Sequence, residues 1–246
     1  LAKFTRNNLN DFAVDIPLGR LVCVTGVSGS GKTTLIRDGL LPALLDKLGD
    51  SAANGRLAKL TGWRSLESVM MVDQSSLGRT PRSNPAVYIG AFDDIRKLFA
   101  ASPEAKALEL PTGAFSFNSA QGQCGHCRGT GFEKVEMQFL SDVFIKCPDC
   151  NGRRYRNHVL EARLTPPLAK RVGWNIADLL DATADEAISF LGGYPDSRPA
   201  ARARAKLQLL SDVGLGYLRL GQPVNTLSGG ESQRLKLIRS LAEAQG

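Results

Sequence analysis

The sequence contains no apolar run approaching the roughly 20 residues that a membrane-spanning helix requires. Its first residues, LAKFTRNNLNDF, lack the apolar segment of a secretory signal peptide. Histidine is scarce too, since only His126 and His158 are present. These absences exclude a helical membrane protein and disfavour a secreted one, so we expect a soluble, cytoplasmic protein with no membrane partner.

Acidic residues are fewer than basic residues. Lys and Arg number 31 against 24 Asp and Glu, which gives a net charge of +7 and an isoelectric point near 9.3. This balance favours a polyanionic partner, although a merely basic, well-solvated surface has the same composition. With 43% hydrophobic and 22% charged residues, the 246-residue chain otherwise has the profile of a globular protein with a sizeable core.

The segment RLVCVTGVSGSGKTTL, residues 20–35, carries a phosphate-binding pattern. Residues 21–24 predict a buried parallel strand, in which Cys23 is expected to be an inert, buried thiol. Residues 26–33 match G-x-x-x-x-G-K-[ST], and a helix can begin at residue 34. Glycines let successive N–H groups face one anion, Lys32 adds a charge for the β- and γ-phosphates, and Thr33 can ligate Mg²⁺. The predicted ATP-binding residues are Gly26, Ser28, Gly29, Ser30, Gly31, Lys32, Thr33 and Thr34; a glycine-rich turn that matches by chance is the alternative.

A second glycine-rich run, LSGGESQRLKL at residues 227–237, resembles the signature motif of ABC-type ATPases. Two glycines at the start of a helix allow the close approach of an anion, which the helix dipole favours. The resemblance implies that this loop completes the ATP site of a second nucleotide-binding domain, in the same protein or in another subunit. The residues assigned to this contact are Ser228, Gly229, Gly230 and Glu231.

The run MMVDQSS, residues 70–76, resembles the Q-loop of the same family and follows a predicted strand over residues 69–72. The resemblance implies that Gln74 senses Mg²⁺ and the attacking water, with an ordinary surface glutamine as the alternative. The family's acidic strand, which carries the Mg²⁺-binding Asp and the general-base Glu, does not follow the signature run here, and the switch histidine is absent as well. We therefore expect a truncated ATPase that binds ATP and hydrolyses it poorly alone.

Four of the five cysteines form two C-x-x-C pairs: Cys124, Cys127, Cys147 and Cys150. The spacing predicts a structural Zn²⁺ site because each pair offers two thiolates to one tetrahedral ion. Alternating apolar and polar residues between the pairs predict a β-hairpin with a turn at residues 141–142. Disulfides are disfavoured in a cytosolic chain, and four thiolates leave no open position for a catalytic metal. His126 could replace a ligand, but we expect it to face solvent.

Together these segments resemble UvrA, the damage-recognition ATPase of bacterial nucleotide excision repair, and more narrowly its C-terminal nucleotide-binding half or a UvrA-like paralogue. The resemblance is carried by IPLGRLVCVTGVSGSGKTTL, DQSSLGRTPRSNPAVYIGAFDDIRKLFA, FSFNSAQGQCGHCRGTG, CPDCNGRRY and DVGLGYLRLGQPVNTLSGGESQRLKL. It implies a dimeric tandem ATPase that binds duplex DNA, probes it for lesions and loads UvrB, which contacts the other half. Departures in TPPLAKRVGW and LSGGESQRLKLIRSLAEAQG favour a paralogue.

Basic residues cluster on and after the cysteine pairs. As a set they are expected to contact DNA phosphates without reading the base sequence, although for any one of them a solvated face is the simpler interpretation. The candidates are Arg128, Lys134, Lys146, Arg153, Arg154 and Arg156. A second basic group, Arg198, Arg202, Arg204 and Lys206, lines a predicted helix.

The predicted fold is α/β, with an incomplete ABC-type P-loop ATPase core over residues 1–80 and 215–246. A helical insertion over 81–214 carries the zinc-bound β-hairpin within 118–158. Two other functions stay open: an ABC ATPase of transport or drug tolerance, and a non-enzymatic, zinc-dependent nucleic-acid-binding module. A protein without zinc would favour the first, and loss of nucleotide binding on Lys32→Ala would count against the second.

Overall fold

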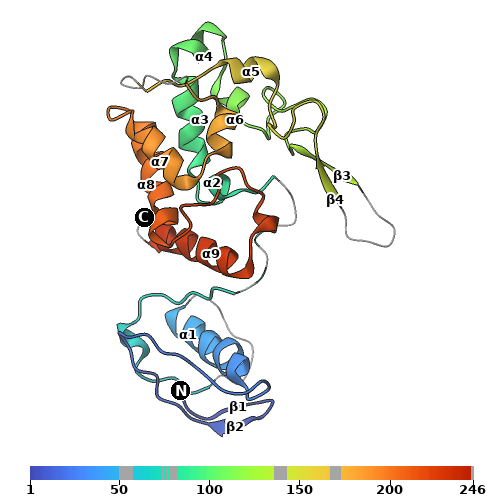
Figure 1. Cartoon of the computed structure of the whole chain (residues 1–246). Coiled ribbons are helices and arrows are strands. Elements are labelled where there is room, and N and C mark those ends of the chain that lie inside the picture. The colour runs from blue at the N-terminus through green and yellow to red at the C-terminus, as the bar shows by residue number, and fades with distance from the viewer. Residues whose placement is uncertain are drawn as a thin grey trace. The chain divides into compact units, whose positions relative to one another are not determined.

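The computed structural model describes residues 1–49, 58–73, 75, 77, 82–135, 143–166 and 173–244. The chain divides into two compact units, Leu1–Met71 and Val72–Gly246. Figure 1 shows the elements of both units. Residues 215–246 cluster with the second unit, so their assignment to one ATPase core with residues 1–80 stays a prediction. Among the described helices, none combines the length and the apolar character needed to cross a membrane.

The first unit holds a small hairpin against a helical segment. Its elements are β1 (Phe4–Arg6), β2 (Leu9–Phe12), η1 (Thr34–Leu40), α1 (Leu41–Leu48) and η2 (Trp63–Ser65). The two strands pair antiparallel, and the π-helical η1 runs directly into α1, which ends at the left-handed Gly49. Phe4 packs on the helix at Gly39, where a Cβ atom would lie 3.0 Å from the Phe4 ring. The hairpin thus supports the helix that follows the predicted phosphate-binding loop.

The strand predicted over residues 21–24 does not form in the described structure. These residues pair with no strand there, and Leu21 is 98% exposed. Cys23 is exposed rather than buried. Residues 69–72 form no strand either, and Met70 and Met71 are exposed. A buried parallel strand needs neighbouring strands and helices over both faces, and the described part of this unit supplies only β1 and β2, so the parallel sheet of the predicted core is not confirmed.

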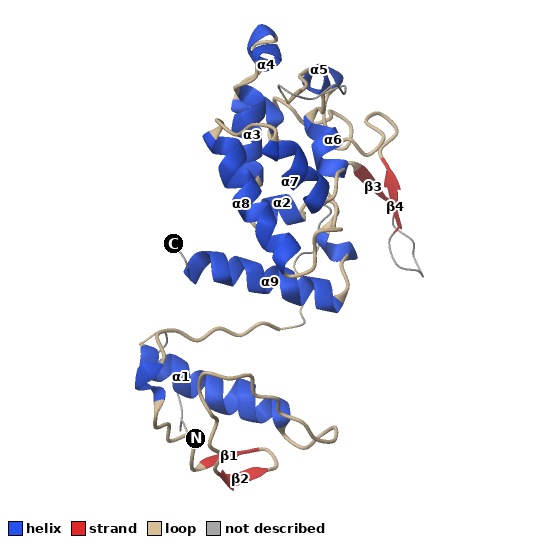
Figure 2. Cartoon of the chain, turned by 60° about the vertical axis from the view of Figure 1, so that its left-hand side comes forward, coloured by secondary structure: helices blue, strands red, loops and turns tan. Residues whose placement is uncertain are grey.

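The second unit is mainly helical, as Figure 2 shows. Its described helices are α2 (Pro85–Tyr88), α3 (Phe92–Ala100), α4 (Pro103–Ala107), η3 (Thr112–Phe115), α5 (Asn157–Glu161), α6 (Ile176–Asp181), α7 (Ala184–Gly192), α8 (Arg198–Asp212), η4 (Val224–Thr226) and α9 (Gly229–Ala244). Its described strands, β3 (Phe132–Val135) and β4 (Val143–Lys146), pair antiparallel with Phe132 opposite Lys146. The predicted hairpin is confirmed; its predicted turn at residues 141–142 lies outside the described residues.

Helices α3, α7 and α8 pack around the main core. Its fully buried members include Ile95 and Phe99 of α3, together with Leu207 and Leu210 of α8. A buried carboxylate also ties α3 to α8, because Asp94 accepts hydrogen bonds from Arg202 Nε and Lys206 Nζ, both at 2.9 Å. Burial alone would raise the pKa of Asp94, but the two cations hold it below its ordinary value. Two of the basic residues predicted on this helix are therefore engaged within the unit.

Candidate zinc centre and nucleotide-binding loops

Residues 26–31 form a tight loop, and the helical segment begins directly after it at Lys32. Gly26, Gly29 and Gly31 all have positive φ, at 148°, 81° and 93°, which side chains rarely adopt. Lys32 folds back over the loop, and its Nζ donates to the carbonyl oxygens of Gly26 at 2.9 Å and Val27 at 2.8 Å. The sequence pattern therefore gives a compact loop with an ammonium group over its backbone, at the start of a helix.

The β1–β2 turn braces this loop, a contact that the sequence analysis did not foresee. Asn8 Nδ2 donates to the carbonyl oxygen of Gly29 at 3.1 Å, and Asn7 Nδ2 donates to Thr34 Oγ1 at 3.3 Å. A Cβ atom on Gly31 would lie 3.0 Å from Asn8 Oδ1, so glycine is needed there for close packing as well as for φ. Two consecutive asparagines are common in turns and gave no signal of their role.

The predicted signature residues lie at the N-terminus of α9. The Ser228 N–H donates to Glu231 Oε2 at 2.7 Å, and the Glu231 N–H donates to Ser228 Oγ at 3.3 Å, which is a reciprocal capping box. Tyr217 donates its hydroxyl to Glu231 Oε1 at 2.7 Å; this bond and the Ser228 bonds lower the pKa of Glu231. Gly229 and Gly230 are exposed, and a Cβ atom on either would meet nothing within 4 Å. The two glycines are therefore open to a ligand.

Lys236, two turns into α9, holds the segment on either side of Gln74. Its Nζ donates to the Asp73 carboxylate, to the Ser75 carbonyl oxygen at 2.7 Å and to Ser75 Oγ at 2.7 Å. The bonds from Lys236 and Ser75 lower the pKa of Asp73 to about 2. Gln74 itself lies outside the described residues, so its predicted role stays a prediction. Its two neighbours are nevertheless hydrogen-bonded to the helix that begins at the predicted signature residues, a link that spacing alone could not show.

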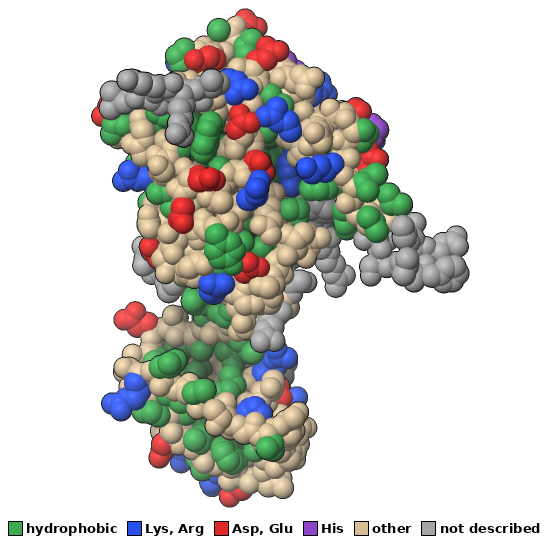
Figure 3. All heavy atoms as spheres, in the orientation of Figure 1, with side chains coloured by type: hydrophobic (Ala, Val, Ile, Leu, Met, Phe, Trp, Pro, Cys, Tyr) green, Lys and Arg blue, Asp and Glu red, His purple; other side chains and the backbone are tan. Residues whose placement is uncertain are grey.

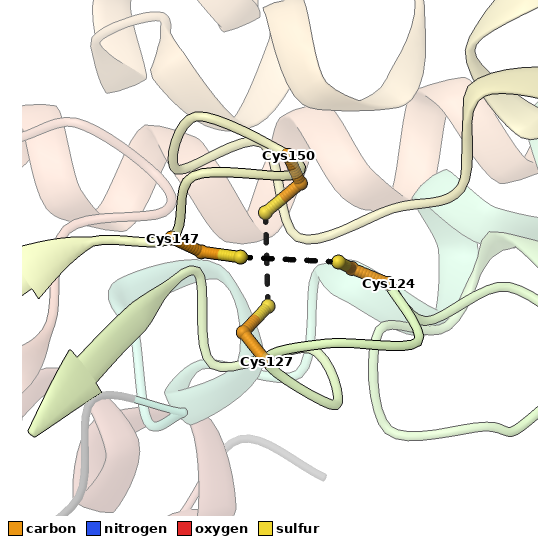
Figure 4. A group of neighbouring side chains, drawn as sticks. All are labelled: Cys124, Cys127, Cys147 and Cys150. Carbon is orange, nitrogen blue, oxygen red and sulfur yellow. Dashed lines mark hydrogen bonds between the residues drawn. The ribbon is translucent and has the colours of Figure 1, made fainter.

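The four predicted metal ligands converge, as Figure 4 shows. All four cysteines are buried, and their sulfur atoms lie within 4.8 Å of one another. The distances between Cys124 and Cys147 Sγ and between Cys127 and Cys150 Sγ are 4.0 and 3.6 Å. Four sulfurs at about 2.3 Å from a tetrahedral ion lie about 3.8 Å apart, so the observed spacing fits Zn²⁺.

The environment of the sulfurs shifts the pKa values of three of the cysteines in different directions. Burial raises the pKa of Cys124 and raises that of Cys150 to about 12. At Cys127 burial acts in the same direction, but N–H groups of Gly131 and Gly129 offset it and lower the pKa. A cation bound here would displace the remaining protons, so its affinity should increase with pH.

His126 lies beside this centre and is partly exposed. Its Nε2 is 2.6 Å from Glu133 Oε1, its Nδ1 is 3.6 Å from Asp149 Oδ2, and its side chain is 45% exposed. Its nitrogen also lies close enough to Glu133 and Cys147 to form a second group of possible ligands. The four thiols complete a tetrahedral set without it.

Known proteins resemble this chain over nearly its whole length. No family model matches the chain. The UvrABC system protein A of Methanothermobacter thermautotrophicus is 48% identical over 237 residues, covering 96% of this chain and 23% of the relative. The corresponding protein of Aquifex aeolicus is 47% identical over 246 residues, covering 100% of this chain and 25% of the relative. The crystal structure of UvrA2 from Deinococcus radiodurans matches with a TM-score of 0.81 and 45% identity, over 99% of this chain and 28% of that one.

The chain matches a region of UvrA. The resemblance drawn from the motifs is thereby confirmed. The chain spans only about a quarter of the length of these UvrA relatives. Which quarter it represents, and the assignment to the C-terminal half, stay predictions.

Five of the six basic residues predicted to meet DNA are exposed near the four-cysteine cluster: Arg128, Lys134, Lys146, Arg153 and Arg156. Figure 3 shows basic side chains on the face of the second unit beside the hairpin. A hollow of about 470 Å³ lies there, and Lys146, Arg153 and Arg219 are among its lining residues. Arg153 also forms an ion pair with Asp178, with Nη2 and Oδ1 at 2.6 Å.

Arg154 is the exception. It is only 4% exposed, and its guanidinium donates to the carbonyl oxygens of Gly129 and Gly221. A buried guanidinium bonded to protein carbonyls cannot meet a phosphate without leaving its site, so the predicted DNA contact is not retained for Arg154. Sequence reasoning placed it with its neighbours because residue type alone does not reveal burial.

Proposed function

We propose that this chain is part of the C-terminal nucleotide-binding half of a UvrA-like DNA-damage-recognition ATPase that uses ATP, Mg²⁺ and Zn²⁺ and binds duplex DNA. The observation that carries the proposal is the match to UvrA over 96–100% of the chain, which includes both glycine-rich loops and all four cysteines. In the whole protein we expect further partners, namely a second nucleotide-binding domain, a second protomer, and UvrB through the other half.

For ATP, the glycine-rich loop and Lys32 supply the phosphate contacts. Lys32 Nζ now donates to two loop carbonyls, and it would turn from them toward the β- and γ-phosphates. Thr33 lies at the helix start, where its hydroxyl would ligate Mg²⁺, and the charge of that ion would neutralise the phosphates. Gln74 would sense that ion.

The second glycine-rich loop would serve an ATP molecule held by another domain. Gly229 and Gly230 are open, and they begin a helix whose N-terminal N–H groups favour an anion. Ser228 Oγ already caps the Glu231 N–H, so its position relative to the helix end is set before ligand binds. Because the acidic catalytic strand is not in this sequence, hydrolysis is to be measured in a longer protein that includes it.

ATP binding tests this part of the proposal. Lys32→Ala should weaken ATP binding about 10- to 100-fold, because a charge-assisted hydrogen bond to phosphate is worth about 1.5–3 kcal/mol. Lys47→Ala, which changes another lysine of the same helical segment, is the matched control and should bind as the parent does. Isothermal titration calorimetry with Mg-ATP measures both, and equal affinities of the two variants would refute the nucleotide site.

Salt dependence tests the DNA part. Each phosphate neutralised contributes about −0.9 to the slope of log K against log salt, so Lys134→Gln with Lys146→Gln should flatten the slope by about 1.8. Lys106→Gln, an exposed lysine of α4, is the control and should leave the slope unchanged. Fluorescence anisotropy with a labelled duplex gives the slope, and a flat response in the parent protein would remove DNA as a partner of this segment.

A further inference from the structure

The two cysteine turns of the zinc centre are structural repeats of each other. In each, the second cysteine is followed by a left-handed non-glycine residue, Arg128 or Asn151, with φ of 50° or 47°. A glycine with φ of 84° comes next in both turns. The other four non-cysteine positions of the two turns differ in sequence. In both turns, however, the N–H four positions after the second cysteine donates to that cysteine's sulfur, from Gly131 at 3.3 Å and from Arg154 at 3.4 Å.

The residue four positions after the second cysteine differs in type between the two turns, but its backbone conformation is the same. Gly131 has φ of 75° and Arg154 has φ of 72°, so the same left-handed conformation is held by glycine in one turn and by arginine in the other. An arginine is strained in this region, where glycine is not. Arg128 and Asn151 also have positive φ but are exposed, whereas Arg154 is buried, which directs attention to what its side chain touches.

Arg154 reaches from the zinc centre to the chain segment that leads to the signature motif. Its Nη2 donates to the Gly221 carbonyl oxygen at 3.0 Å, and its Nη1 to the Gly129 carbonyl oxygen at 3.4 Å. Its guanidinium carbon lies 5.2 Å from the centre of the Phe117 ring. In the first turn, a Cβ atom on Gly131 would lie 2.9 Å from the Gly152 carbonyl oxygen and 3.0 Å from Arg154 Cγ, so glycine fits closely against the second turn.

Both backbone polar groups of Gly221 are hydrogen-bonded. Its N–H donates to the Leu180 carbonyl oxygen of α6 at 2.6 Å, and its carbonyl accepts from Arg154. A Cβ atom on Gly221 would lie 2.9 Å from that Leu180 oxygen, so the backbone fits closely. Six residues separate Gly221 from Ser228, three of which form η4. The Val224 N–H within η4 donates to the Ser83 carbonyl oxygen at 2.9 Å.

We propose that Arg154 is a positioning residue that joins the zinc centre to the signature loop. The zinc centre fixes Cys150 Sγ, which fixes the Arg154 backbone, and the guanidinium then fixes the Gly221 carbonyl and the residues up to Ser228. A change at the DNA-facing zinc module is thereby transmitted to the loop assigned to ATP. The transmission between a DNA-binding and an ATP-binding region rests on the proposed function. The contacts from Cys150 through Arg154 to Gly221 do not depend on it.

The test separates the link from the zinc site and from ATP binding. Arg154→Gly keeps the left-handed backbone and removes the side chain, so it should retain one zinc per chain while amide exchange at residues 221–228 becomes about tenfold faster or more. Arg154→Lys, which keeps one donor, should restore part of the protection. Lys106→Gln, at the exposed lysine of α4, is the control and should exchange as the parent does. Hydrogen–deuterium exchange with mass spectrometry reports the segment, and amides of α8 report overall folding.

Zinc removal supplies the decisive comparison. Chelation should accelerate exchange at residues 221–228 in the parent and add little in Arg154→Gly, since the link is already absent. Equal acceleration in both proteins, parent-like protection in Arg154→Gly, or loss of its zinc would overturn the proposal. If the ATPase of the longer protein is active, Arg154→Gly should lower kcat more than it raises KM. Failure of Mg-ATP to bind the parent would refute the proposed function and leave the exchange result intact.

Discussion

Substitution of a single zinc ligand should remove the metal and loosen the base of the β3–β4 hairpin. Cys147→Ser is the most informative change, because Cys147 is fully buried and directly follows β4. Its N–H also donates to the Gly131 carbonyl oxygen at 3.0 Å, so the position joins both cysteine turns. Serine is smaller and does not form a thiolate, so the backbone bond can persist while the ligand is lost.

The expected magnitude follows from the geometry. The sulfur pairs at 3.6 and 4.0 Å lie close to the spacing of about 3.8 Å expected around Zn²⁺, so little rearrangement is needed to bind it. Structural zinc contributes about 10–16 kcal/mol in comparable peptides, or about 2.5–4 kcal/mol for each of four thiolates. Loss of one ligand should therefore weaken zinc binding by about 10²–10³-fold.

Zinc content by atomic emission and competition with a chromogenic chelator measure the effect. The parent should hold one zinc per chain, and Cys147→Ser should hold far less at the same chelator concentration. Cys23→Ser is the matched control, because Cys23 is exposed and lies outside the cluster. In the parent, affinity should fall as the pH is lowered, because the raised pKa of Cys150 means that protons compete strongly for its sulfur. Undiminished zinc in Cys147→Ser, or lost zinc in Cys23→Ser, would refute the assignment.

Three further substitutions test the fold. Leu207→Ala should destabilise the second unit by about 2–5 kcal/mol in urea unfolding, since Leu207 is fully buried, whereas the exposed Leu237→Ala should cost far less. Tyr155→Phe should cost about 1–3 kcal/mol in the same assay, because it removes a buried hydroxyl that donates to the Phe115 carbonyl oxygen at 3.0 Å. Asp73→Asn should lower the melting temperature at neutral pH; because the folded pKa of Asp73 is below 3.8, the difference from the parent should persist above that value and shrink as the pH falls toward about 2.

The parts of the site that the sequence could predict are those made by neighbouring residues. Each cysteine pair sits in one turn, and the glycines that shape the phosphate-binding loop lie within six residues of one another. Short motifs of this kind constrain their own geometry, so Cys124 and Cys127 converge on the second pair as expected. The hairpin between the pairs follows from alternation along two short strands.

The parts that could not be predicted depend on distant partners. Residues 21–24 have the composition of a buried strand, yet a parallel strand is stable only beside other strands, and the described residues place none there. Likewise, the bonds from Lys236 to Asp73 and Ser75 join positions more than 160 residues apart, and nothing in either local sequence indicates the other.

The role of Arg154 depends on a distant partner, yet the sequence contains an indication of it. The indication comes from comparing the two cysteine turns with each other. Aligning CGHCRGTG with CPDCNGRR pairs every conformationally restricted position and sets Gly131 against Arg154. Where two copies of one turn share their backbone angles, an arginine in the place of glycine bears a conformational cost that its twin avoids. Arg128 bears a similar cost at an exposed position, but Arg154 is buried, so its side chain interacts with the protein interior. The comparison of the two turns therefore favours an arginine that is kept for a contact within the protein. The hydrogen bond from Arg154 to the Gly221 carbonyl oxygen is such a contact.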